Sequence, residues 1–234
     1  MHILAIGGGG FRATDRYGAT PGPLIEHALS LTGKETPKVC ALYTATGDDV
    51  ARIANWYAAW ADRPEPASHV TVLPMPNVDD LRRHLLAQDA VYVGGGSVAG
   101  LMVLWRLHGL DAVFREAWQA GVVLFGVSAG SLCWHAGGTT DSFGPELRPW
   151  TDGLGLIPGS NCPHYDSEPR RRPLYQRLVA EGVLPPGYAA DDGVGLHYAG
   201  TELHEAVSDR AEASAWRVDP AGETQVQTRL LAVP

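Results

Sequence analysis

Residues 122–130 read Val-Val-Leu-Phe-Gly-Val-Ser-Ala-Gly, a short apolar run that ends in a serine between two glycines. The run Val122–Val127 has the length of a strand, and Ala129–His135 can form a helix. A G-x-S-x-G pattern between a strand and a helix is typical of a nucleophile elbow, where the hydroxyl stands clear of the sheet. A serine that only caps the helix is the alternative interpretation. We predict that Ser128 is a nucleophile.

Short apolar runs that end near glycine recur along the first half of the chain. They are His2–Ile6, Val39–Tyr43, Val70–Leu73 and Ala90–Val93. Continuously apolar runs of this length are typical of strands buried on both faces, as in a parallel sheet. Segments with helical period separate them, namely Pro21–Leu31, Asp48–Ala61, Val78–Leu86, Val98–Leu107 and Asp111–Ala120. This alternation predicts an α/β fold with a doubly wound, mostly parallel sheet and helices on both of its faces.

The alternation ends after Ser128. Thr139–Cys162 is rich in Gly, Pro and Thr and is predicted to be a long loop. A helix over Pro173–Ala180 precedes a β-rich C-terminal tail, with strands at Gly193–Tyr198 and Glu202–Val207 and a hairpin around Asp219-Pro-Ala-Gly. The sequence has no internal repeat and no linker, so we expect a single domain over residues 1–234.

Composition narrows the class of protein. Hydrophobic residues make up 45% of the 234 residues and charged residues 19%, which argues against intrinsic disorder. The formal charge of −8 argues against nucleic-acid binding, and no apolar run approaches the roughly 20 residues that span a bilayer. Three cysteines are too few for a disulfide scaffold, and the N-terminus lacks the basic start of a signal peptide. We expect a soluble, cytoplasmic protein with neither nucleic acid nor membrane as partner.

A nucleophilic serine needs a base, and His164 is the best candidate. It follows Cys162-Pro163 at the end of the predicted loop, which leads back to the same edge of the sheet. Pro163 fixes its own φ, so the histidine lies in a positioned turn. A structural loop histidine is the alternative. His135 would lie two turns along the predicted elbow helix, with its side chain pointing away from the Ser128 hydroxyl. His197 and His204 lie in strand-like runs, which are typical of surface or packing residues.

A carboxylate should orient the histidine, and several are candidates. Asp141 and Glu146 lie between Ser128 and His164, and Asp166 lies two residues beyond the histidine. Asp191 and Asp192 come later in the chain and could also return to the site. Physical reasoning from the residues leaves this choice open.

Two further segments could contact a substrate. Gly94-Gly-Gly-Ser97 ends a predicted strand, and a backbone N–H there could stabilise an oxyanion together with the amide of Ala129. A plain turn is the alternative. Arg170-Arg-Arg172 lies close to His164 and could bind a substrate carboxylate, or it could be a solvated basic turn.

Cofactor sites are not indicated. Cys162 and His164 lack partners at metal-ligand spacing, so no metal site is predicted. Gly8–Ala13 matches G-x-G-x-x-A, but no helix is predicted to start at that turn, as dinucleotide binding requires.

Four segments together resemble one known family. They are Gly94-Gly-Gly-Ser97, Val127-Ser-Ala-Gly130, Thr140-Asp-Ser142 and Pro163-His-Tyr165. In this order they resemble peptidase family S51, which includes dipeptidase E and cyanophycinase, and the resemblance covers roughly residues 1–210. It implies a fold similar to class I glutamine amidotransferases, with serine in place of their catalytic cysteine.

The resemblance also implies roles for individual residues. Ser128 would be the nucleophile, His164 the base and Asp141 the acid, with Glu146 as the alternative acid. The glycine loop would supply an oxyanion donor, for which we choose Gly95 beside Ala129. A substrate-binding arginine follows the histidine in dipeptidase E, and Arg170 and Arg171 lie in that neighbourhood at a different spacing.

The expected protein is a serine peptidase that cleaves small peptides through an acyl-enzyme, with dipeptides carrying an N-terminal Asp as its substrates. No metal or organic cofactor is expected. The alternatives are a cyanophycinase-like β-Asp-Arg peptidase, an esterase with the same triad, and a catalytically silent binding module. The sequence is compatible with a monomer and with a homodimer.

Overall fold

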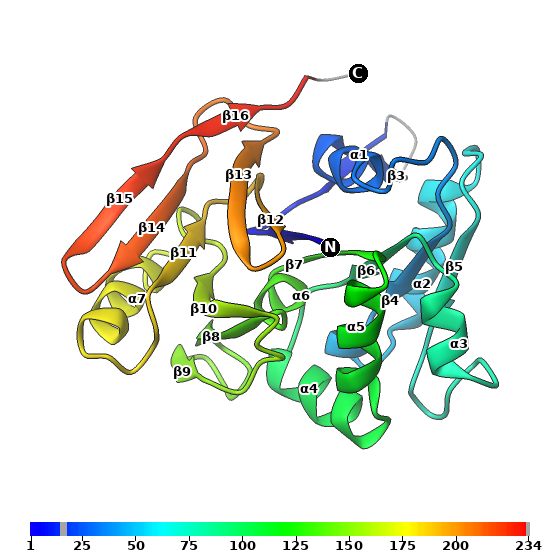
Figure 1. Ribbon diagram of the computed structural model, residues 1–234, viewed down its shortest axis with the longest axis horizontal. Coiled ribbons are helices and arrows are strands. Elements are labelled where there is room, and N and C mark those ends of the chain that lie inside the picture. The colour runs from blue at the N-terminus through cyan, green and yellow to red at the C-terminus, as the bar shows by residue number, and fades with distance from the viewer. Residues whose placement is uncertain (15–17, 233–234) are drawn as a thin grey trace.

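The computed structural model describes residues 1–14 and 18–232, which form two larger sheets and one small one (Figure 1). The eight-stranded sheet has the order β16-β13-β12-β1-β7-β6-β4-β5. The six-stranded sheet has the order β15-β14-β11-β10-β8-β9, and β2 (Phe11–Ala13) pairs with β3 (Ala19–Pro21). One apolar cluster includes Ile3 and Leu124 of the larger sheet and Ile157 and Ala215 of the other.

The centre of the eight-stranded sheet is parallel. Its five parallel strands are β1 (His2–Ile6), β7 (Val123–Val127), β6 (Ala90–Val93), β4 (Val39–Leu42) and β5 (Ala67–Val70). The strands β12 (Val194–Ala199), β13 (Glu202–Ser208) and β16 (Thr228–Leu230) extend it beyond β1. The predicted strand at Val70–Leu73 is wrong, because the strand ends at Val70.

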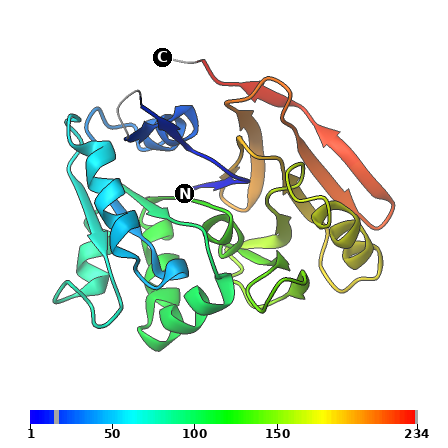
Figure 2. The same ribbon diagram turned by 180° about the vertical axis from the view of Figure 1, so that it is seen from behind.

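Helices cover both faces of this sheet, as predicted. They are α1 (Pro23–Ser30), α2 (Val50–Trp60), α3 (Leu81–Leu86), α4 (Val98–Leu107) and α5 (Leu110–Gln119), with a short 3-10 turn at Thr44–Thr46. Leu24 and Trp56 pack on one face, and Trp105 and Phe114 pack on the other. Figure 1 has α5 in front of the parallel strands and α2 behind them, and Figure 2 reverses this order. The doubly wound α/β fold is therefore confirmed.

The long loop predicted at Thr139–Cys162 is wrong. That stretch contains the end of β8 (His135–Thr140), β9 (Arg148–Trp150) and β10 (Ile157–Cys162). Two of its glycines lie against neighbouring backbone, since a Cβ on Gly153 would lie 1.9 Å from the carbonyl oxygen of His135 and a Cβ on Gly159 2.9 Å from that of Pro186. The helix predicted over Ala129–His135 is shorter than expected, because α6 spans only Ala129–Leu132 before the chain enters β8.

The C-terminal part of the chain supplies the remaining strands of the six-stranded sheet. Its strands are β11 (Gly187–Ala190), β14 (Ala215–Asp219) and β15 (Gly222–Val226), and the predicted hairpin after Asp219 joins β14 to β15. Helix α7 (Arg171–Ala180) begins two residues before the predicted start and covers this sheet through Tyr175 and Leu178. Among the described residues, no helix has the length and apolar character needed to cross a bilayer.

Candidate active site

Ser128 lies at the turn between β7 and α6, at the carboxyl edge of the parallel strands. Open α/β sheets bind ligands at this edge. The serine backbone has φ 57° and ψ −114°, a conformation that non-glycine residues rarely adopt and that persists only where neighbours hold it. Its N–H donates to the carbonyl of Ile6 at 3.1 Å, and its carbonyl accepts from the N–H of Leu132 at 2.9 Å.

The two glycines beside Ser128 are required by close backbone packing. A Cβ on Gly126 would lie 2.4 Å from the carbonyl oxygen of Gly130, and a Cβ on Gly130 would lie 2.0 Å from that of Val93. The start of α6 therefore presses directly on β6 and β7. This packing explains the G-x-S-x-G spacing and holds the turn that carries Ser128.

The glycine loop after β6 lies against the serine. A Cβ on Gly95 would be 3.1 Å from the Cβ of Ser128 and 3.6 Å from its Oγ. The backbone of Gly95 thus borders the hydroxyl, and Ala129 follows the serine at the start of α6. The structure brings together the two residues predicted to donate to an oxyanion, and that role stays a prediction.

His164 is paired with a carboxylate, and that carboxylate is Asp192. Nδ1 of His164 lies 2.7 Å from Oδ1 of Asp192, and the two side chains are 21% and 33% exposed. His164 follows β10, whereas Asp192 lies in the connection between β11 and β12. The hydrogen bond to His164 lowers the pKa of Asp192, although burial acts in the opposite direction.

Further polar contacts hold the loop that carries Asp192. Its backbone N–H donates to Oδ1 of Asp166 at 2.8 Å. Arg210 donates through Nη1 to the carbonyl of Asp192 at 2.8 Å and to Oδ2 of Asp166 at 3.1 Å. Asp166 therefore positions the loop through its backbone and does not contact the histidine ring in this arrangement.

The prediction that Asp141, or alternatively Glu146, orients the histidine does not match this geometry. Both residues are exposed in the connection between β8 and β9. Within the described ranges neither carboxylate is hydrogen-bonded to His164, and Asp192 occupies that position. Asp141 was chosen from the family resemblance, whereas the carboxylate beside the ring in this structure comes from the connection between β11 and β12.

Gly8 lies between the residue that binds the Ser128 amide and the pair of His164 and Asp192, and the sequence analysis did not predict this role. A Cβ on Gly8 would lie 2.0 Å from Oδ1 of Asp192 and 3.0 Å from Nδ1 of His164. Gly8 follows β1 by two residues, and the carbonyl of Ile6 at the end of β1 holds the Ser128 amide. His164 and Ser128 therefore lie at the same edge of the sheet, on either side of this segment.

Replacing Gly8 by alanine should lower any turnover at this site at least about 10-fold, because the new methyl group displaces Asp192 from the imidazole ring. The turnover of the variant relative to the wild-type chain checks this, with its far-UV circular dichroism as the control for folding. Full turnover in a folded Gly8→Ala variant would contradict the arrangement described above.

The arginines after His164 are engaged in structural contacts. Arg171 is buried, binds Glu168, and donates to the carbonyl of Thr139 at 3.0 Å. Its predicted role in substrate binding does not fit this position. Arg170 is exposed and donates to the carbonyl of Pro145 at 2.9 Å. Arg172 lies over the Trp216 ring and pairs with Glu223.

The cysteines are unsuited to act as nucleophiles. Burial raises the pKa of Cys40 and Cys162 to about 12, and it also raises the pKa of Cys133 in the segment after α6. A thiolate is therefore disfavoured at all three positions. Ser128, which is partly buried at the carboxyl edge of the sheet, stays the candidate nucleophile.

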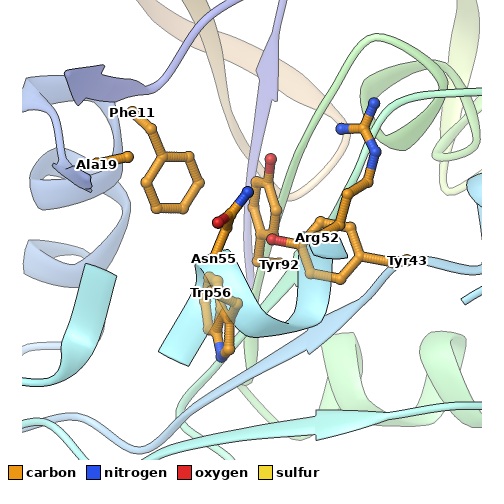
Figure 3. Close-up of a pocket in the computed structure, with 7 residues that line it drawn as sticks. All are labelled: Phe11, Ala19, Tyr43, Arg52, Asn55, Trp56 and Tyr92. Carbon is orange, nitrogen blue, oxygen red and sulfur yellow. The ribbon is translucent and has the colours of Figure 1, made fainter. Parts of the chain in front are cut away.

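A cavity of about 200 Å³ lies beside the glycine loop (Figure 3). Tyr43 joins the two features, because a Cβ on Gly94 would lie 2.6 Å from its ring. Figure 3 shows Phe11 at one side of the cavity and the guanidinium of Arg52 at the other, next to Tyr43. The lining residues are Phe11, Ala19, Tyr43, Arg52, Asn55, Trp56 and Tyr92.

Arg52 supplies the positive charge of this cavity. It lies in the first turn of α2, where the helix dipole adds to its charge. In the part of the chain that the structure describes, no carboxylate forms an ion pair with Arg52. The cavity thus combines aromatic walls with a cation, and Tyr43 connects it to the glycine loop.

Comparisons with known proteins agree on one family. The model of peptidase family S51 matches residues 3–206. The uncharacterized peptidase YgaJ of Bacillus subtilis (strain 168) is 42% identical over 216 residues, covering 92% of this chain and 91% of its own. Peptidase E of Shewanella denitrificans is 25% identical over 202 residues, covering 82% and 84%.

Solved structures have the same fold. A peptidase from an acI-B1 actinobacterium superposes with a TM-score of 0.67 at 18% identity, covering 97% of this chain and 94% of its own. A putative peptidase E from Listeria monocytogenes EGD-e has a TM-score of 0.57 at 14% identity, covering 97% and 98%.

Proposed function

Since the chain belongs to peptidase family S51 and is a peptidase, we propose that it is a serine peptidase that hydrolyses small peptides with Ser128, His164 and Asp192. The single observation that carries the catalytic assignment is the 2.7 Å contact between His164 Nδ1 and Asp192 Oδ1. It leaves Nε2 of the histidine as the atom that can take a proton from a nucleophile. The G-x-S-x-G turn is, in this proposal, a nucleophile elbow.

The reaction proceeds through an acyl-enzyme. Nε2 of His164 takes the proton of the Ser128 hydroxyl while Oγ bonds to the scissile carbonyl carbon, and Asp192 stabilises the imidazolium. The C–N bond then breaks, and the proton passes from the imidazolium to the leaving amine. A water molecule, deprotonated by His164, hydrolyses the ester and frees Ser128. The amides of Gly95 and Ala129 bind the oxyanion of both tetrahedral intermediates, a contribution of about 3–4 kcal/mol per donor.

One contact must form during this cycle. Among residues 1–14 and 18–232, no hydrogen bond joins the Ser128 hydroxyl to the His164 ring. In hydrolases this contact often shortens only in the substrate complex. Substrate binding next to Gly95 would bring the hydroxyl towards the imidazole.

The proposed substrates are dipeptides with an N-terminal Asp. Two observations support this choice. One relative bears the name peptidase E, and the cavity next to the glycine loop contains Arg52 without an ion-pair partner among the described residues. We assign to Arg52 the carboxylate recognition that the sequence analysis gave to Arg170 and Arg171.

Replacing Arg52 by methionine should lower kcat/KM for Asp-Leu by about 10- to 100-fold, the typical effect of losing a hydrogen bond to a charged group. Hydrolysis of an uncharged p-nitrophenyl ester should change little. Arg170→Met is the matched control, since its guanidinium is engaged with Pro145, and this variant should retain its preference for Asp-Leu. Equal losses in both variants, or none in Arg52→Met, would contradict the assignment.

A substrate panel tests the proposed function as a whole. Asp-Leu should be cleaved faster than Leu-Leu, β-Asp-Arg and a p-nitrophenyl ester. Preference for β-Asp-Arg would instead indicate a cyanophycinase-like enzyme, and cleavage of the ester alone an esterase. If the protein hydrolyses none of them and a fluorophosphonate probe does not label Ser128, the chain is a silent member of its family.

A further inference from the structure

A second cluster of chemically active side chains lies away from Ser128. It combines His27 on α1, His197 on β12 and Glu205 on β13. The register of β12 and β13 places His197 directly opposite Glu205. One ligand atom from each residue lies within 4.8 Å of the other two. Because the three residues come from elements remote in sequence, no short motif marks this cluster.

The distances in the cluster fit a metal ion. Nε2 of His27 lies 3.5 Å from Oε1 of Glu205, and Nδ1 of His197 lies 3.7 Å from the same oxygen. A tetrahedral zinc with bonds of about 2.0–2.1 Å separates neighbouring ligand atoms by about 3.4 Å. Two of the three separations are thus within a few tenths of an ångström of this value, and the third, between the two histidine nitrogens, is at most 4.8 Å.

Two of these three ligand atoms form no hydrogen bond within the described part of the chain. Nε2 of His27 and Nδ1 of His197 are buried without a hydrogen-bond partner among the described residues. The His197 side chain is only 4% exposed, so bulk water does not supply one. Buried polar atoms are nearly always satisfied in folded proteins. A single cation between the two nitrogens and the carboxylate would satisfy both at once.

His2 and Arg229 contact two of the proposed ligand residues. Nε2 of His197 lies 3.0 Å from Nδ1 of His2, and a proton on that Nε2 leaves a lone pair on Nδ1. Metal-binding histidines usually have such a second contact. Arg229 donates to both oxygens of Glu205, from Nε to Oε2 at 2.8 Å and from Nη2 to Oε1 at 3.0 Å, and thereby orients the carboxylate.

We propose that His27, His197 and Glu205 bind one zinc ion, with water as a fourth ligand. Two imidazoles and a carboxylate form a donor set that zinc commonly takes. The ion would tie α1 to β12 and β13. A surface cavity bordered by Pro23, Glu26 and His27 lies next to the cluster. His197 pairs with Leu4 in the middle of β1, whereas the Ser128 amide binds Ile6 at its end, so the site stabilises the fold without taking part in hydrolysis.

The test uses the untagged full-length protein after treatment with a chelator. Isothermal titration should show one zinc ion per chain, and cobalt in its place should give the intense visible absorption of a tetrahedral site. The unfolding midpoint should rise with free zinc. Peptidase activity should be the same with and without zinc, which separates this site from the proposed catalytic one.

Variants locate the ligands. His27→Gln and Glu205→Gln should each weaken zinc affinity by more than about 10-fold and abolish the tetrahedral cobalt spectrum. His204→Gln is the matched control, since this exposed histidine lies beside His197 outside the ligand set. Circular dichroism of each variant verifies folding. Absence of stoichiometric zinc binding by the wild-type chain, or binding unchanged in folded His27→Gln and Glu205→Gln, would overturn the proposal.

Discussion

Replacing Ser128 by alanine should lower kcat for Asp-Leu by about 10⁴- to 10⁶-fold, because in the proposed mechanism only Ser128 forms the acyl-enzyme. The remaining rate comes from the oxyanion donors and from substrate binding. A single-turnover assay with the purified variant measures the loss, and a fluorophosphonate probe should label the wild-type chain and not the variant. Ser30→Ala removes an exposed hydroxyl on α1 and should keep the full rate.

Stability measurements separate this loss from misfolding. Alanine at position 128 keeps a Cβ at φ 57°, so its free energy of unfolding should stay close to that of the wild type. Glycine at the same position relieves the backbone strain and should be more stable than alanine by about 1 kcal/mol. Urea unfolding of both variants checks this order. A strongly destabilised Ser128→Ala variant, or one that retains activity, would contradict the role of Ser128.

Replacing Asp192 by asparagine should lower kcat by about 10⁴-fold. The asparagine side chain is nearly the same size, but it cannot stabilise the imidazolium and permits the wrong tautomer of His164. Asp141→Asn and Glu146→Gln are the matched controls, since both residues are exposed and lie outside the contact with the histidine. A large loss in Asp141→Asn together with an active Asp192→Asn would restore the choice made from the sequence.

The lowered pKa of Asp192 also predicts how stability depends on pH. A carboxyl whose pKa is lower in the folded than in the unfolded chain stabilises the fold when it is ionised. This contribution is complete above the unfolded pKa, about 3.9, and disappears as the pH falls through the lower folded value. The stability difference between the wild type and Asp192→Asn should therefore shrink as the pH falls below about 4. Urea unfolding at several pH values measures it.

Much of the fold could be predicted because its elements carry their own signals. The runs His2–Ile6 and Ala90–Val93 are continuously apolar and became strands with those bounds. The helix at Val98–Leu107 was predicted over the same residues. Thr139–Cys162 was misassigned because glycine and proline in its strands mimic the composition of a loop. In this region close backbone packing, and not hydrophobic pattern, determines the structure.

The sequence by itself determined the turn around Ser128. Gly126 and Gly130 permit strand and helix backbones to touch, and this requirement is local, so five consecutive residues are enough to reveal it. Only the tertiary structure decided which carboxylate faces His164. β10 pairs with β11, and the bend into β12 then carries Asp192 to the histidine, a placement that depends on strand register. Local patterns cannot encode such a long-range pairing, because it results from how the two sheets pack together.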